Sequence, residues 1–229
     1  MPRSSRESSV STMSEGPCLD TDIVLKCAAW NLEGELLGIL SANGKPATLG
    51  LVHLIAAKQM SRLRLNDREA GGRNLDILLS QLECLEPDQQ EAELAAEIVE
   101  VAQVRNLPID PGEAQLFAIA SSRCIPLLLT GDKRAIRAMS EINEDQGLAL
   151  KDRLVCLEQA IRAIAAATQP LTVRDKICSE PEVDGAMRLV CSCGRQDWDP
   201  AQLDEGLESF IAEIRRGAGL LLHGGSLLA

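Results

Sequence analysis

The chain has 229 residues, of which 45% are hydrophobic, so it can bury a core, but only 2% are aromatic and none is tyrosine. Its formal net charge is −11, so the molecule as a whole repels polyanions, and a nucleic acid needs a local basic patch or a bound metal. The scarcity of aromatic residues also argues against a stacking platform for single-stranded nucleic acid.

The N-terminal region predicts a tail, a short strand and a helix. Residues 1–16 are rich in serine and low in hydrophobicity, which is typical of a disordered tail. A short strand is expected to end at Asp20, with a helix over residues 23–30 after it. Asp20 is then either a carboxylate at the end of a strand or a helix N-cap, and Asp22 is either a further ligand or a first-turn acid.

The next part of the chain predicts one strand, one loop and three helices. The strand is expected over residues 36–40, the loop over 66–73 and the helices over 46–65, 75–85 and 88–105. Apolar residues at helical spacing indicate the helices, and an acidic first turn supports the third of them.

Residues 107–139 predict strand, helix, strand and helix, and we regard them as the organising stretch of the fold. An apolar run over 107–110 leads into a helix with Asp110 as N-cap and Pro111 at its first position. Residues 125–129 are uniformly apolar, which suits a strand covered on both faces.

Acidic residues fall where these strands end. Glu113 lies in the first turn of one helix, and Asp132 lies just past a strand. Ligands bind outside the carboxyl ends of parallel strands, and hard cations prefer oxygen ligands. A metal site is therefore one interpretation. Helix capping is the other, because Asp110 and Glu113 fit a capping box and Asp132 is a natural N-cap.

The C-terminal part predicts a linker followed by a helical extension over residues 148–229. The expected segments are a polar linker over 140–146, a short strand or connection over 148–150, and helices over 151–167, 173–178, 183–193 and 200–222. Residues 150–229 are the expected surface for a protein partner or for a homodimer.

The cysteines and the lack of targeting signals bear on the compartment. No apolar signal-peptide core and no stretch of about 18 apolar residues occurs, so we expect a cytoplasmic protein without a membrane span and with reduced thiols. Cys178, Cys191 and Cys193 also suggest structural zinc, with Cys156 or His223 as a fourth ligand. Paired Cys-x-x-Cys spacing is missing, which favours free thiols.

Three segments in this order resemble PIN-domain proteins, a family that includes VapC-type toxin ribonucleases. The segments are LDTDIVL at 19–25, DPGEA at 110–114 and LLLTGDKRA at 127–135. The resemblance covers about residues 17–145. It implies an α/β fold for a PIN-like domain over residues 17–147, a three-layer α/β/α sandwich with a mostly parallel central sheet.

The resemblance further implies an endoribonuclease that depends on Mg²⁺ or Mn²⁺. Asp20, Glu113 and Asp132 take the catalytic and metal-ligand positions. The supporting positions fall on Asp22, Asp110, Thr130 and Lys133. A metal held there activates a water for attack on an RNA phosphodiester.

One family feature is missing. PIN proteins usually carry a further acid in the helix after the first one, whereas no acid occurs from Ser41 to Asn66, and His53 or its neighbours align with that position. Three carboxylates can still hold one Mg²⁺, which keeps several waters. A second hypothesis is therefore a non-catalytic PIN-like interaction or regulatory module that acts through its C-terminal helices. A third is an ordinary α/β protein with a small-molecule site at the same strand ends.

Overall fold

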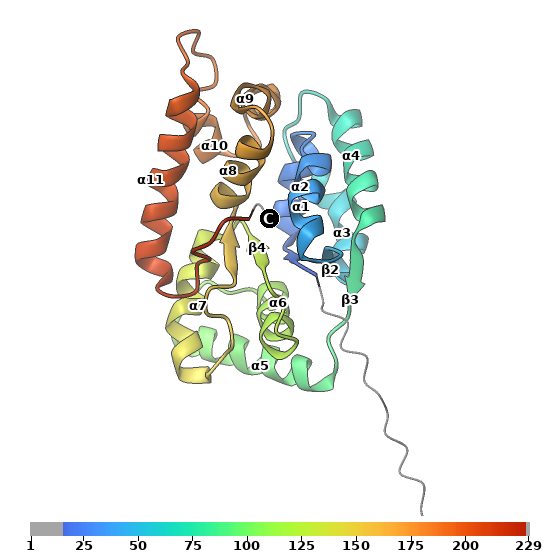
Figure 1. The fold of residues 1–229 in the computed structure, drawn as a ribbon. Helices are drawn as coiled ribbons and strands as arrows, with labels where there is room; N and C mark the ends of the chain where they lie inside the picture. The colour runs from blue at the N-terminus through green and yellow to red at the C-terminus, as the bar shows by residue number, and fades with distance from the viewer. Residues whose placement is uncertain (1–15, 228–229) are drawn as a thin grey trace, which may run out of the picture.

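A computed structural model describes residues 16–227 and shows an α/β/α sandwich around a five-stranded, all-parallel sheet (Figure 1). The strands are β1 (Cys18–Leu19), β2 (Ala47–Leu49), β3 (Glu83–Leu85), β4 (Leu128–Thr130) and β5 (Leu154–Cys156), in the spatial order β3-β2-β1-β4-β5. The predicted fold class is thereby confirmed. Of the expected tail, residues 1–15 lie outside the described residues, and Gly16 is buried.

The helices surround the sheet on both sides. They are α1 (Thr21–Ala29), α2 (Glu33–Leu40), α3 (Gly50–Met60), α4 (Arg68–Gln81), α5 (Gln89–Val104), α6 (Pro111–Ser122), α7 (Lys133–Gln146), α8 (Leu157–Ala167), α9 (Pro170–Ser179), α10 (Gly185–Val190) and α11 (Pro200–Ala218), with a 3₁₀ turn η1 (Ser41–Asn43). Figure 1 shows α1–α4 gathered toward the β3 end of the sheet and α8–α11 toward the β5 end. Helix α11 packs on α7 and α8.

The strand register places several helix starts at one edge of the sheet. Cys18 pairs with Ala47 on one side and with Leu128 on the other, and Leu128 pairs with Leu154. Helices α1, α3, α7 and α8 therefore all begin beside the carboxyl ends of neighbouring strands. Backbone N–H groups at these helix starts favour negative charge at the same edge.

Three strands were predicted as parts of helices, and those predictions were wrong. Residues 47–49, 83–85 and 154–156 are the strands β2, β3 and β5. Each is only three residues long. A strand that short shows no alternation of apolar and polar residues, and an apolar run cannot by itself be told from a helix segment. Pairing with neighbouring strands decides its conformation.

Three further predictions also differ from the structure. Residues 36–40 belong to α2 rather than to a strand, because the buried Leu36, Ile39 and Leu40 follow helical spacing. Residues 107–110 form no strand. The predicted linker over 140–146 continues α7, since Ile142 extends its buried face and Gly147 ends it with φ 62°.

The segment 148–229 is built into the sheet as well as into helices. Strand β5 pairs with β4 along its whole length, and α8 follows β5 directly. Leu154 also bridges to Leu222 near the end of the described chain. The sheet therefore continues past residue 147, and the tail after α11 reaches its β5 edge.

A disulfide joins Cys178 to Cys193, with their Cα atoms 5.2 Å apart. The prediction of reduced thiols was wrong for these two residues, and with them bonded to each other the less favoured alternative, a zinc cluster with Cys191, does not form either. The path of the chain from α9 through α10 brings the two cysteines together in a way that spacing does not reveal. Among residues 16–227, no helix combines the length and apolar character needed to cross a bilayer.

Candidate acidic cleft

A cleft of about 780 Å³ opens beside the carboxyl ends of β1 and β4. Its polar lining consists mainly of the acids Asp20, Asp22, Asp110, Glu113 and Asp132 and the bases Lys26, Lys133 and Arg134. An apolar wall from α3 and its surroundings completes it, with Leu49, Leu51, Val52 and Ile55. The predicted site residues therefore lie around one cleft, except for Thr130, which is buried below them.

Asp20 and Asp132 are linked through Thr130. The Thr130 hydroxyl donates a hydrogen bond to Asp20 Oδ2 (3.0 Å) and accepts one from the backbone N–H of Asp132 (3.2 Å). Asp20 Oδ1 accepts from the N–H of Thr21 (2.6 Å), as an N-cap does. Burial, with the charge of Asp22 beside it, raises the pKa of Asp20 to about 6, although the two hydrogen bonds oppose this shift.

Glu113 is oriented by the predicted capping box. Its N–H donates to Asp110 Oδ1 (2.8 Å), and its own Oε2 accepts from the N–H of Asp110 (2.8 Å). Burial raises the pKa of Glu113 to about 8, and the charges of Asp110, Asp132 and Asp20 add to the effect. The carboxylates of Asp132 and Asp20 are thus close enough to Glu113 to disfavour its charged form.

Asp132 differs from the other two acids because it has a basic partner. Its Oδ1 accepts from the N–H groups of Arg134 (2.7 Å) and Ala135 (3.2 Å), and the Arg134 guanidinium contacts Oδ2 at 2.9 Å. Burial raises the pKa of Asp132, but these hydrogen bonds outweigh burial and hold it below its usual value. The Arg134 side chain is 75% exposed, so it can leave Asp132 for solvent or a ligand.

Glycine at position 131 allows the acids to approach closely. A Cβ atom there would lie 1.8 Å from Asp22 Oδ2. Any larger residue would push Asp22 away from the turn between β4 and α7. Because Gly131 has no side chain, Asp22 can lie beside Thr130 and Asp132 at the same edge of the sheet.

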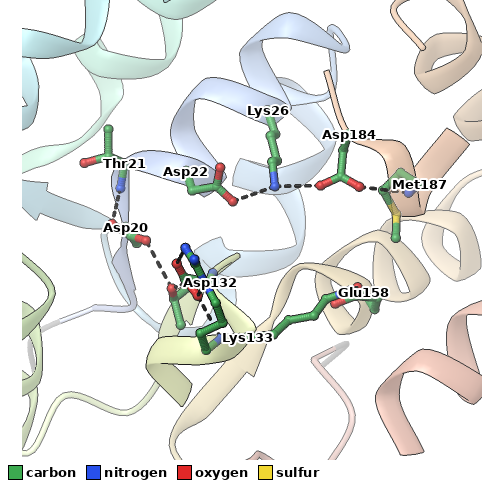
Figure 2. A network of polar contacts seen from close by, with 11 residues as sticks. Asp20, Thr21, Asp22, Lys26, Asp132, Lys133, Glu158, Asp184 and Met187 are labelled. Carbon is green, nitrogen blue, oxygen red and sulfur yellow. Dashed lines mark hydrogen bonds and ion pairs between the residues drawn. The ribbon is translucent and has the colours of Figure 1, made fainter. Parts of the chain in front are cut away.

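Ion pairs at the edge of the cleft include residues that the sequence did not single out. Lys26 contacts Asp22 and Asp184, and Lys133 contacts the buried Glu158 (Figure 2). The spacing of Asp22 and Lys26, four apart on one helix, could have suggested the first contact. No local signal marks the others, because Glu158 and Asp184 come from α8 and from the start of α10.

The candidate ligands are all carboxylate oxygens, which hard cations such as Mg²⁺ prefer. Among residues 16–227, however, no group of three or more His, Cys, Asp or Glu lies close enough together to hold a metal ion. Each acid instead accepts local hydrogen bonds, so the capping interpretation also describes the present arrangement. Shared ligation requires Asp132 to release Arg134 and Glu113 to turn toward Asp20.

Replacing Glu113 with glutamine is expected to stabilise the protein at pH 8. A carboxyl whose pKa rises from 4.5 to about 8 on folding binds more protons when folded, so its contribution to stability falls as pH rises between these values. Glutamine still accepts the Asp110 N–H and carries no charge. Because Glu113 is partly exposed, we expect a gain of only about 1–2 kcal/mol. Urea unfolding at pH 5 and pH 8 measures it, and an equal gain at both pH values would contradict the explanation.

No family model matches this chain, and neither the curated proteins nor the solved structures include a significant match. The resemblance to PIN domains therefore stays a prediction, and a function has to be argued from the acidic cleft itself.

Proposed function

We propose that this chain is a PIN-like phosphodiesterase that binds Mg²⁺ or Mn²⁺ in the acidic cleft and hydrolyses RNA. The observation that carries the proposal is the convergence of three acids on one cleft: Asp20 and Asp132 follow the neighbouring parallel strands β1 and β4, and Glu113 comes from the first turn of α6. This is the place where open α/β sheets bind ligands.

The electrostatics of the acids support a cation as the ligand. Burial raises the pKa of both Glu113 and Asp20, and neighbouring charges raise them further: Asp110, Asp132 and Asp20 act on Glu113, and Asp22 and Asp110 act on Asp20. Helix capping alone gives no reason to gather these charges. A divalent cation would remove the repulsion, and its binding would release the proton that Glu113 carries at neutral pH. The bound cation would also weaken the repulsion between an RNA phosphate and the protein, whose net charge is −11.

The proposed roles follow from the contacts of each side chain. Bound Mg²⁺ or Mn²⁺ supplies an activated water and a positive charge against the phosphate oxygens. Asp20, Glu113 and Asp132 are the residues that would hold it. Thr130 fixes Asp20 Oδ2 through its hydroxyl. Arg134 is exposed at the cleft, and its planar guanidinium matches a phosphate in two hydrogen bonds.

Titration of the full chain with Mn²⁺ by calorimetry tests the metal site. We expect binding in the micromolar range for the native protein and loss of binding in Asp132→Asn. Asparagine keeps the N-cap of α7, so the variant removes charge without removing the cap. Glu144→Gln on the same helix, an exposed acid outside the cleft, is the matched control and should bind like the native protein. An absence of Mn²⁺ binding in the native protein would contradict the proposal.

A second candidate is a non-catalytic PIN-like module that binds a protein or a second copy. Two observations favour it. The bases that line the cleft, Lys26, Lys133 and Arg134, all contact acids, and residues 16–227 contain no ready-made group of three metal ligands. This second function predicts that Mn²⁺ does not bind saturably. It also predicts that the chain self-associates or captures a partner through residues 150–229.

Truncation before β5 is unsuitable as a test because it exposes the edge of β4. Light scattering of the full chain, with and without Mn²⁺, separates the two readings.

A further inference from the structure

Lys26 lies at the boundary between the acidic cleft and the C-terminal helices. It lines the cleft from α1, and its ammonium group is 2.7 Å from Asp22 Oδ2 and 2.7 Å from Asp184 Oδ2. Only 15% of its side chain is exposed. Figure 2 shows the lysine between the two carboxylates, with Asp184 on the side away from Asp20. A base of the cleft is thus held by an acid from 158 residues later in the chain.

Asp184 is itself held in place by two different contacts. Its Oδ1 accepts from the N–H of Met187 (2.9 Å) and caps α10, while its Oδ2 accepts from Lys26 (2.7 Å). The cap fixes the carboxylate independently of the lysine. Substitution by asparagine would therefore keep the cap and remove only the charge that binds Lys26.

The segment that carries Asp184 is a closed loop. The disulfide between Cys178 and Cys193 encloses it, and Glu180 inside the same loop is buried. The carboxylate of Glu180 accepts from the N–H groups of Asn66 (2.6 Å) and Asp67 (2.7 Å), between α3 and α4. Two acids of one disulfide-closed loop thus reach back to the first half of the chain.

The charges around Lys26 determine what it can bind. In the present arrangement two carboxylates surround the ammonium group, so the three side chains together carry a net charge of −1 and repel a phosphate. If Asp184 withdraws, Lys26 keeps Asp22 as its partner, this repulsion is lost, and the ammonium group gains a free hydrogen-bonding position for an anion where Asp184 lay. A lysine ammonium is a compact phosphate-binding group.

We propose that Lys26 is an anion-binding residue of the acidic cleft, and that the disulfide-closed segment 178–193 is a latch that keeps it from its ligand through Asp184. The proposal rests on the proposed function for the identity of that ligand, an RNA phosphate. Opening the disulfide loosens the latch, because it lengthens the chain that is free to move between α9 and α11.

The opening step is a two-electron reduction by a dithiol. The dithiol transfers two electrons and two protons, the Sγ–Sγ bond breaks, Cys178 and Cys193 become thiols, and the dithiol closes to its own disulfide. Both cysteines are half-buried rather than fully buried, so a small thiol can reach them.

Amine labelling of Lys26 tests the latch without reference to catalysis. The oxidised native protein is compared with Asp184→Asn, with Cys178→Ser/Cys193→Ser and with Glu182→Gln. Glu182 is an exposed acid of the same loop that pairs with Arg188, and it serves as the control. Acetylation of Lys26 is read by peptide mass spectrometry relative to the exposed Lys151. We expect a rise of about tenfold in Asp184→Asn, since it loses a charge-assisted hydrogen bond, and about threefold in the cysteine variant.

Binding of a labelled single-stranded RNA oligonucleotide in EDTA, followed by anisotropy, supplies the second readout. RNA affinity should rise by about three- to tenfold in Asp184→Asn and should also rise in the cysteine variant, while Glu182→Gln stays at the native value. Unchanged labelling in either test variant, or labelling that rises without tighter RNA binding, overturns the latch. The proposed metal site is tested separately: if the native protein does not bind Mn²⁺, the proposed function fails, but the labelling experiment still decides whether Asp184 shields Lys26.

Discussion

Under the proposed function, Asp20→Asn is expected to reduce Mn²⁺-dependent RNA cleavage by roughly 10²–10³-fold, because loss of a proposed metal ligand removes several kcal/mol of transition-state stabilisation. Asp20 receives two hydrogen bonds and lies at the end of β1 in the middle of the sheet. Asparagine retains an oxygen for the N-cap and is nearly the same size. The fold should therefore persist while the charge is lost.

The measurement is initial-rate cleavage of a labelled RNA with Mn²⁺, alongside thermal unfolding of each variant. Asp76→Asn, an exposed acid on α4 outside the cleft, is the control and should cleave at the native rate. If the double variant Asp20→Asn/Asp132→Asn cleaves as fast as the native protein, the activity does not belong to this cleft. If a variant melts at the same temperature as the native protein, its slower cleavage reflects a loss of catalysis and not a loss of the fold.

Lys133→Met is expected to destabilise the protein by about 3–5 kcal/mol, because it removes the cation that pairs with the buried Glu158 carboxylate. The Glu158 side chain is 1% exposed, and its carboxylate forms an ion pair with Lys133. Lys133 also lies over the Phe210 ring, 4.6 Å from its centre. One lysine thus joins the start of α7 to α8 and α11.

Thermal or urea unfolding measures this loss, which corresponds to a melting temperature lower by about 10 °C for a chain of this size. The double variant Lys133→Met/Glu158→Leu should recover most of it, since replacing a buried ion pair by apolar residues is often neutral. Arg137→Met is the matched control: Arg137 also links α7 to α11, but its ion pair with Glu213 is exposed, and exposed pairs contribute about 0–1 kcal/mol. Equal stability of the single and double variants would show that the Glu158 charge is not the cause.

The sequence alone determined the features that depend on near neighbours in the chain. Asp110 and Glu113 form the capping box that their three-residue spacing predicts, and Asp88 and Glu91 form a second one with the same spacing. Asp132 caps α7 as expected. These contacts form within one turn, so local sequence is sufficient to specify them. The parallel α/β fold was implied by the resemblance to PIN domains, and the strands that end before Asp20 and Asp132 were the two that the sequence placed correctly.

Only the tertiary structure decided the features that join distant segments. Strands β2, β3 and β5 have three residues each, and such a run becomes a strand because a neighbouring strand accepts its backbone hydrogen bonds. The pairing of Lys26 with Asp184, of Lys133 with Glu158 and of Cys178 with Cys193 also depends on how the C-terminal helices pack against the sheet. No local pattern encodes these contacts, because each side chain gains its partner only when the whole chain is folded.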